Sequence, residues 1–207
     1  ECDWSSDVCS SDLVLTMITQ SFPMDQALGL DKNLKVDMRS LGWIGNMSNT
    51  NEFVYTPKTS PTKTLEDARR RETTIAATGV GSIATQLTAL YNNRLGTKFK
   101  IIYGYPSGPE MTLAMERGEV EARSTSNPQV LGVSAAEVKA KYNFLIQAGL
   151  ARIAGYEEFP LLNDLAKGEP ERRIFEFLSK SAALARPVGT NPGVPRERRS
   201  EEHTAEL

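Results

Sequence analysis

The chain contains few of the residues on which many metal sites and hydrolases depend. Among its 207 residues there are two cysteines, Cys2 and Cys9, and one histidine, His203. Residues 13–197 contain neither type. That part of the chain therefore cannot supply a thiol nucleophile, a Cys–His zinc site or a Ser-His-Asp triad. The sequence predicts no metal and no cofactor.

Charge excess and long apolar runs are also absent. The 24 basic residues nearly balance the 26 acidic ones, so nothing indicates a nucleic-acid partner. No apolar run approaches the roughly 20 residues of a membrane span, and no signal peptide is recognisable. We therefore expect no direct insertion into a membrane. A chain that is 40% hydrophobic and 24% charged is typical of a soluble globular protein.

The two ends of the sequence are unusual. Residues 1–12 read ECDWSSDVCSSD, and residues 198–207 read RRSEEHTAEL. Both resemble peptides that arise when sequencing-adapter DNA is translated in frame. We therefore expect both ends to be artefactual flanks of a fragment.

Two strand–loop–helix units follow one another in the middle of the chain. The first is predicted as a strand at Thr73–Ala77, a glycine-containing loop at 78–81 and a helix that Ser82 opens. The second is a strand at Phe99–Tyr103, a loop at 104–108 and then another helix. A third strand is predicted at Val120–Arg123.

Repeated β-α-β order predicts a mostly parallel sheet with helices on its faces. Ligands bind beyond the carboxyl ends of such strands, where both glycine-containing loops begin. Each loop also presents backbone N–H groups at a helix N-terminus, which favours a small anion such as a carboxylate. The alternative is that the glycines only allow tight turns; they are Gly79, Gly81, Gly104 and Gly108.

Three flanking segments carry further local predictions. Thr64 and Asp67 form a capping-box pattern at the start of a short helix, which ends in the basic run Arg69–Arg71. Those arginines are interpreted as a solvated helix end, with an anion contact as the alternative. The stretch Leu41–Met47 predicts a buried Trp43 and Ile44 followed by a turn at Gly45-Asn46. Glu169–Ser181 predicts an amphipathic helix whose buried stripe is Ile174, Phe175, Leu178 and Ala182.

Several segments together resemble the substrate-binding receptors of tripartite tricarboxylate transporters, the Bug family. They are, in order, GWIGNM, TSPTKTLEDAR, ATGVGS, GTKFKIIYGYPSGPEMTLAMERGEVEAR, FLIQAGL, FPLLNDLAKGEPERRIFEFL, ARP and NPGVP. The resemblance covers about residues 22–196. No single motif is diagnostic, but the ordered set is specific.

The resemblance implies an α/β fold of the type II periplasmic-binding-protein class, with two lobes that close like a clam shell. It implies an extracytoplasmic, periplasmic receptor, not an enzyme, that captures a small di- or tricarboxylate and delivers it to the membrane components of the transporter. Backbone amides and hydroxyls would hold the ligand. The implied ligand-binding residues are Thr78, Gly79, Gly81 and Ser82, then Tyr105, Pro106, Ser107 and Gly108. Arg123 and Ser124 are weaker candidates, and Gly45 and Asn46 would represent the first lobe.

The same resemblance gives expected domain boundaries. Residues 13–63 would be part of the first lobe with the hinge crossing, 64–187 the second lobe, and 188–197 a truncated return segment. The signal peptide and much of the first lobe would be missing. A half-site bears the cost of immobilising a ligand without all of the contacts, so we expect little affinity from the fragment.

Two other functions remain possible from the residues. A small α/β enzyme acting on an anionic or phosphorylated substrate is one, since the loop at 78–82 is similar to a phosphate-binding loop, although it lacks the Walker A lysine. The carboxylates nearest to its loops are Glu110, Glu119 and Glu121, of which Glu110 is interpreted as a first-turn helix residue and the other two as solvated. A regulatory ligand-binding domain of the same fold is the other. For a receptor, we expect Tyr105 and Arg123 to set ligand choice, with Arg123 pairing a carboxylate.

Overall fold

The computed structural model describes residues 15–18, 21–29, 36–47, 50–126, 134–184 and 186–195. The chain divides into two compact units, a smaller one made of 1–49 with 184–207 and a larger one made of 50–183. In this division residues 50–63 belong to the larger unit, whereas the second lobe expected from the sequence begins at residue 64. The flanks 1–12 and 198–207 lie outside the described residues.

The larger unit contains a mixed five-stranded sheet. Its strand order is β5 (Phe99–Ile102), β4 (Thr73–Ala76), β6 (Ala122–Thr125), β3 (Glu52–Pro57) and β7 (Tyr142–Ala148). Strand β4 pairs in parallel with β5 and β6, whereas β3 pairs antiparallel with β6 and β7. All strands except β3 therefore run in one direction. The predicted parallel arrangement is confirmed for β5, β4 and β6. The prediction did not include the antiparallel strand β3 that lies beside β6.

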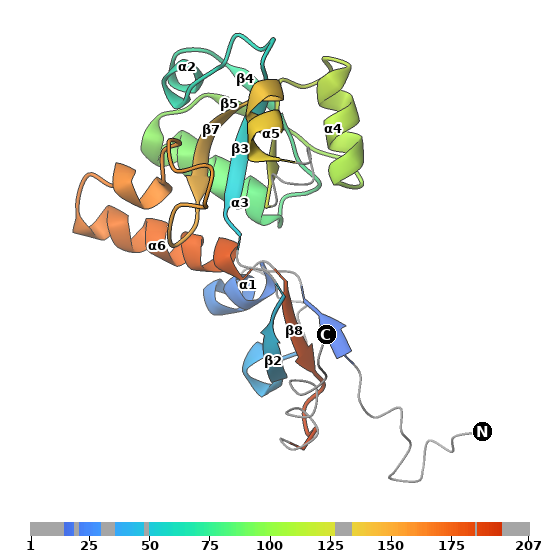
Figure 1. Cartoon of the computed structure of the whole chain (residues 1–207). Helices are drawn as coiled ribbons and strands as arrows, with labels where there is room; N and C mark the ends of the chain where they lie inside the picture. Colours follow the sequence, from blue (N-terminus) through green and yellow to red (C-terminus); the bar gives the residue numbers. More distant parts are fainter. Residues whose placement is uncertain are drawn as a thin grey trace. The chain divides into compact units, whose positions relative to one another are not determined.

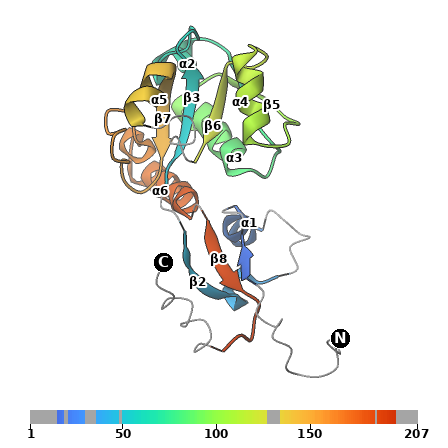
Figure 2. The same ribbon diagram turned by 45° about the vertical axis from the view of Figure 1, so that its right-hand side comes forward.

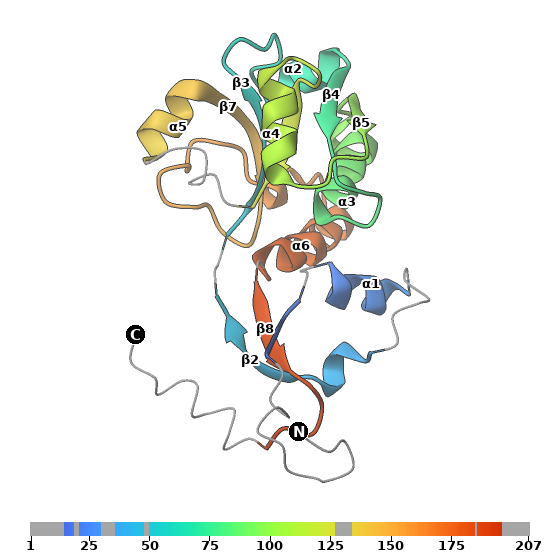
Figure 3. The same cartoon turned by 90° about the vertical axis from the view of Figure 1, so that its right-hand side faces the viewer.

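Helices cover both faces of this sheet. In Figure 1, α5 (Ala135–Lys141) lies in front of β3 and α3 (Ile83–Leu90) passes behind it, and the view turned by 90° separates them to opposite sides (Figure 3). Helix α4 (Gly108–Glu116) packs on β6 and β3, and α6 (Glu169–Ala183) on β7 and α3. The remaining helical pieces are α2 (Leu65–Arg70), the π-helical turn Tyr91–Leu95 that extends α3, and the 3-10 turn Leu162–Leu165.

An aromatic cluster forms the core on the α4 and α5 face. Phe53 and Phe144 meet edge to face with ring centroids 5.6 Å apart, and Tyr55 and Tyr142 do the same at 5.0 Å. Met111, Ala114 and Met115 of α4 pack against this cluster. Edge-to-face pairs of this kind contribute about 0.5–1.5 kcal/mol each beyond area burial, so they strengthen the packing of β3 against β7.

Local signals place the helix ends where the sequence predicts them. The capping box is present: Asp67 N–H donates to Thr64 Oγ1 at 3.1 Å, and Thr64 N–H donates to Asp67 Oδ2 at 3.0 Å. Ser82 is the N-cap of α3. Gly96 and Gly118 follow their helices with φ of 71° and 77°, a left-handed conformation that other residues avoid.

The smaller unit is built on an antiparallel sheet of three short strands. Strand β8 (Pro187–Thr190) lies between β1 (Leu15–Met17) and β2 (Gly42–Asn46) (Figure 2). Helix α1 (Phe22–Leu28) and the 3-10 turn Met38–Ser40 complete the described part. The predicted turn at Gly45-Asn46 is wrong, because both residues pair with β8 beyond a bulge. Trp43 is 40% exposed rather than buried.

Other local predictions also need correction. Ile174 is exposed, although Phe175 beside it is fully buried; the Ala182 side chain lies outside the described residues. The third strand begins two residues later than expected. Arg71 is not a solvated end, since its guanidinium donates to both carboxylate oxygens of Glu121 and to the Thr62 hydroxyl. The ion pair forms because Glu121 lies immediately before β6, where its N–H bonds to β4.

Candidate functional site

The fold brings the two glycine-containing loops to one edge of the sheet. Strands β4 and β5 are parallel neighbours, with Ala76 opposite Ile102 at their carboxyl ends. The TGVGS loop (78–82) follows β4 and leads into α3, and the GYPSG loop (104–108) follows β5 and leads into α4. This is the arrangement that the sequence predicts for the two loops. The first amides of each following helix have no acceptor within the helix, which favours an anion there, although Pro109 of α4 has no N–H and the Glu110 carboxylate accepts from its own N–H.

Hydrogen bonds within the TGVGS loop hold its shape. Ser82 Oγ accepts from the Thr85 N–H at 3.2 Å and donates to Thr85 Oγ1 at 3.0 Å. Thr85 Oγ1 in turn donates to the Gly79 carbonyl at 2.7 Å, which also accepts from the Ser82 N–H. The loop is therefore formed in advance of any ligand. Thr85 was not singled out in the sequence, although its position three residues after an N-cap serine could have indicated it.

The glycines of the TGVGS loop are not required by its own geometry. Neither Gly79 nor Gly81 has a positive φ, and a Cβ at either position would meet no atom within 4 Å. Gly81 is exposed and Gly79 half-buried. The alternative that glycine only allows a tight turn does not account for these two positions. A surface without Cβ atoms is what permits close approach of a ligand to the backbone.

In the GYPSG loop, by contrast, backbone conformation and packing explain why glycine is present. Gly104 has φ of 103°, which strains any other residue. Gly108 is confined by Arg123, since a Cβ there would come within 3.2 Å of Arg123 Nη2. The candidates Tyr105 and Ser107 are half-buried and Pro106 is exposed. For this loop, turn geometry and packing explain why glycine is needed.

A carboxylate of the protein already occupies the N-terminal turn of α4. The Ser107 hydroxyl donates to Glu110, and this hydrogen bond lowers the pKa of the Glu110 carboxyl below its usual range. Glu110 is exposed, so it can be displaced. An anionic ligand at this turn would therefore meet a negative charge unless Glu110 moves. The sequence placed Glu110 in the first helical turn but did not indicate the bond to Ser107.

Arg123 lies beneath the GYPSG loop and is only 6% exposed. Its Nε donates to the Ser124 carbonyl at 3.1 Å, and its Nη1 donates to the Gly108 carbonyl and to Thr112 Oγ1. The guanidinium also lies 5.7 Å from the ring centroid of Tyr55. Burial raises the pKa of the Tyr55 hydroxyl, and the charge of Arg123 opposes that rise.

Arg123 also forms part of the wall of an open cavity of about 650 Å³. Helix α4 contributes Glu116 to this cavity, and β7 contributes Tyr142. Burial raises the pKa of the Tyr142 hydroxyl, and the negative charge of Glu116 acts in the same direction. The cavity thus contains one charge of each sign, and it is less suited to a simple anion than the exposed loop backbones.

Ser124 points to the opposite face of the sheet from Arg123, because successive strand residues alternate. Its hydroxyl donates to Glu52, and both side chains are at most 5% exposed. The pair joins β6 to β3 inside the sheet. Glu52 was missed in the sequence, where an acidic residue at the start of the apolar run EFVYT was the only indication. Arg123 and Ser124 are therefore adjacent in sequence but separated by the sheet.

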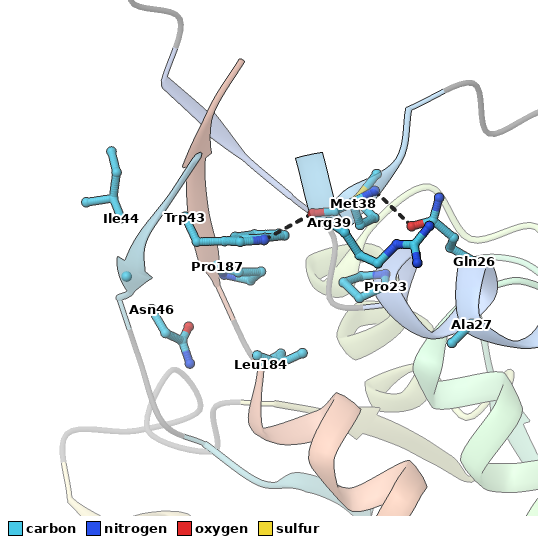
Figure 4. A pocket seen from close by; sticks show the side chains of 11 residues that line it. Pro23, Gln26, Ala27, Met38, Arg39, Trp43, Ile44, Asn46, Leu184 and Pro187 are labelled. Carbon is cyan, nitrogen blue, oxygen red and sulfur yellow. Dashed lines mark hydrogen bonds between the residues drawn. The ribbon is translucent and has the colours of Figure 1, made fainter. Parts of the chain in front are cut away.

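Gly45 and Asn46 belong to the smaller unit, where they line a cavity of about 940 Å³ (Figure 4). Its wall is mostly apolar, and Trp43 is oriented by a 3.1 Å hydrogen bond from Nε1 to the Met38 carbonyl. Asn46 Oδ1 accepts from the Arg186 N–H at 3.0 Å. These two candidates are thus in a different unit from the two loops.

In the ranges that the structure describes, no group of three His, Cys, Asp or Glu side chains could hold a metal ion. The helices within those ranges are all too short or too polar to cross a membrane.

No protein-family model matches the chain, and no curated protein matches it in sequence. Several solved structures are similar in fold. They include a TctC solute-binding protein from Polaromonas (19% identity, TM-score 0.60, covering 94% of this chain and 64% of that one). The periplasmic binding protein BugD matches at 15% identity and TM-score 0.62, over 91% of this chain and 60% of that one.

A third is MatC from Rhodopseudomonas palustris with bound malate, at 14% identity and TM-score 0.60, covering 91% of this chain and 61% of that one. The chain thus spans less than two thirds of the length of these proteins. Over that span, it has the α/β fold of periplasmic solute-binding proteins of the TctC and Bug type.

Proposed function

We propose that the chain is part of an extracytoplasmic receptor that binds a small organic acid of the di- or tricarboxylate type. The fold likeness supports this, since MatC with bound malate shares the fold. The ligand carboxylates would be held by backbone amides and hydroxyls of the TGVGS and GYPSG loops, at the N-termini of α3 and α4. The proposal is one of binding, without catalysis.

One observation carries the proposal furthest. Gly79 and Gly81 are accessible glycines that neither backbone conformation nor packing requires. They border the first turn of α3, where unpaired N–H groups and the helix dipole favour negative charge. An anion could approach this backbone within hydrogen-bond distance only while Cβ atoms are absent. We assign Thr78, Gly79, Gly81 and Ser82 to this half of the site.

The partners and the extent of the receptor are part of the same proposal. The bound acid would be delivered to the membrane components of a tripartite tricarboxylate transporter. The larger unit would correspond to most of one lobe, and the smaller unit, which contains Gly45 and Asn46, to part of the other. This agrees with a chain that spans about 60% of the similar proteins. We accordingly expect weak binding, since a half-site makes only some of the contacts.

The test is a titration of the isotope-labelled 207-residue chain followed by amide NMR spectra. Malate, succinate and citrate are added in turn, with sodium chloride at matched ionic strength as the control. Amide signals of both loops should shift with at least one acid and saturate in the range of about 1 mM or weaker. If no acid shifts either loop while a nucleotide or sugar phosphate does, the enzyme alternative is favoured.

A glycine variant separates binding from folding. Gly81→Ala should leave the free energy of unfolding within about 0.5 kcal/mol of the wild type, because its Cβ projects into open space. It should also weaken the response of the TGVGS loop to the acid. Gly168→Ala, which also has room for a Cβ, is the matched control and should bind normally. Normal binding by Gly81→Ala would remove this loop from the site.

A further inference from the structure

Arg123 is hydrogen-bonded to two residues that belong to the candidate site, Gly108 and Ser124. Its Nε donates to the carbonyl of Ser124 at the end of β6, and its Nη1 donates to the carbonyl of Gly108, the first residue of α4. The same Nη1 donates to Thr112 Oγ1, which itself donates to the Gly108 carbonyl at 3.1 Å. A single guanidinium therefore ties the first turn of α4 to the neighbouring strand.

The guanidinium is enclosed on two sides, by the Tyr55 ring and by Gly108, while another side borders the cavity of about 650 Å³. The Tyr55 ring lies 5.7 Å away, and the space where a Gly108 Cβ would be is 3.2 Å from Nη2 and 3.6 Å from Nη1. Nε and Nη1 would have to give up these acceptors if this side chain, which is only 6% exposed, extended toward a ligand. Breaking hydrogen bonds of a buried charge is costly, so this conformation is strongly preferred.

We propose that Arg123 is a positioning residue for the GYPSG loop and does not itself contact the ligand. It holds the first turn of α4 against β6 and thereby sets where the amides and hydroxyls of 104–108 are presented. This inference rests on the proposed function of the loop. It replaces the expectation that Arg123 pairs directly with a ligand carboxylate. Lysine cannot substitute, because only a guanidinium offers Nε and Nη donors in one fixed plane.

The first experiment compares Arg123→Lys, Arg123→Met and the wild type by amide NMR without ligand. Signals of the GYPSG loop should move and exchange faster with water in both variants, while those of the TGVGS loop stay in place. Arg117→Gln removes one positive charge, as Arg123→Met does, at the exposed C-terminal end of the same helix and is the control. A role in general stability alone would lower protection across the unit without singling out one loop.

Titration with the acid that shifts the wild type then measures affinity. Both Arg123 variants should bind about tenfold more weakly, as expected when a binding loop loses its preorganisation, and Arg117→Gln should stay within about twofold. Weaker binding with an undisturbed GYPSG loop would mean that Arg123 contacts the ligand, and the positioning role would be wrong. If the wild type responds to no acid, the proposed function fails, but the ligand-free spectra still decide whether Arg123 positions the loop.

A double-variant cycle tests the contact between Arg123 and Gly108, and a Thr112 variant tests the hydrogen bonding of Arg123 to α4 without any change at Arg123. Gly108→Ala should destabilise the wild type, in which the guanidinium fills the available space, and should be better tolerated together with Arg123→Lys. Thr112→Val removes one acceptor of Nη1 while keeping the charge, and should move the GYPSG signals in the same direction as Arg123→Lys. Additive effects of Gly108→Ala and Arg123→Lys would overturn the proposal.

Discussion

Asn51 and Gly149 are packed so closely that no other residue fits at position 149. A Cβ added to Gly149 would lie 1.6 Å from Asn51 Oδ1 and 2.2 Å from its Cγ. Asn51 cannot easily yield, because its Nδ2 donates to Gln147 Oε1 at 2.8 Å and to the Ala151 carbonyl at 2.7 Å. The glycine thus permits a buried amide network that anchors the segment after β7.

Gly149→Ala is expected to destabilise the larger unit by about 2–4 kcal/mol, since overpacking and a broken buried hydrogen bond each cost about 1–3 kcal/mol. Chemical denaturation measures the loss. Gly168→Ala serves as the control, because the nearest atom to its added Cβ is 3.9 Å away. A loss below 0.5 kcal/mol, near the size of ordinary surface changes, would mean that Asn51 rearranges freely.

Tyr91→Phe should make the protein more resistant to alkali. The Tyr91 hydroxyl is buried without a hydrogen-bond partner among the described residues. Burial raises its pKa above the ordinary value of 10.0, and the charge of Glu52 adds to the rise. A raised pKa gives stability that is complete below the unfolded value and declines as pH increases beyond it.

The wild type should therefore lose stability from about pH 10 upward, and Tyr91→Phe should lose it less steeply. Unfolding midpoints at a series of pH values provide the measurement. Tyr103→Phe is the control, because Tyr103 is 47% exposed. Equal slopes for the Tyr91 and Tyr103 variants would contradict the assignment. Part of the decline should persist in Tyr91→Phe, since burial also raises the pKa of Tyr55.

The capping box of α2 should be visible in the titration of Asp67. Its Oδ2 accepts from the Thr64 hydroxyl at 2.9 Å and from the Lys63 N–H at 3.0 Å, and the bond from the Thr64 side chain is the main reason its pKa is lowered. A lowered pKa stabilises the fold above the ordinary value of 3.8, and this contribution disappears as pH falls through the lowered value.

Thr64→Ala should consequently raise the pKa of Asp67 toward 3.8, measured by NMR titration of its carboxyl. The exposed Thr59, changed to alanine, should leave that titration unaltered. An unchanged pKa of Asp67 in Thr64→Ala would mean that the hydrogen bond from Thr64 to the Asp67 carboxylate does not form when the protein is in solution.

Glu110→Gln should strengthen binding of an acid at the GYPSG loop, if the proposed function is right. The variant removes the negative charge of the carboxylate that accepts a hydrogen bond from the Ser107 hydroxyl at the N-terminus of α4. We expect an increase of about two- to fivefold, in line with the modest size of exposed helix-end charge effects. NMR titration with the responding acid measures it. Glu119→Gln, at an exposed position three residues after the end of α4, controls for net charge. Unchanged or weaker binding by Glu110→Gln would place the carboxylate elsewhere.

Much of the local structure could be predicted from the sequence. The starts of α2 and α3 could be predicted from Thr64, Asp67 and Ser82, because an N-cap acts through atoms within four residues of itself. The two loops could be located for the same reason: glycines and a change of periodicity mark the passage from strand to helix. Their common position at one sheet edge followed from the rule that parallel strands end together. These features need no knowledge of distant residues.

The tertiary structure decided what depends on partners far along the chain. Strand β3 enters the sheet antiparallel, and its Glu52 meets Ser124, 72 residues later. The sequence predicts Arg123 as a ligand contact at a strand end. In the structure its hydrogen-bond acceptors lie on α4 and β6, and its side chain is buried beneath the loop. Residue pattern alone cannot tell a charge that faces a ligand from one that holds a loop. The sequence by itself determined the loops and helix starts, because these are local. Only packing decided which polar groups stay free, since long-range pairing of strands determines which side chains find partners.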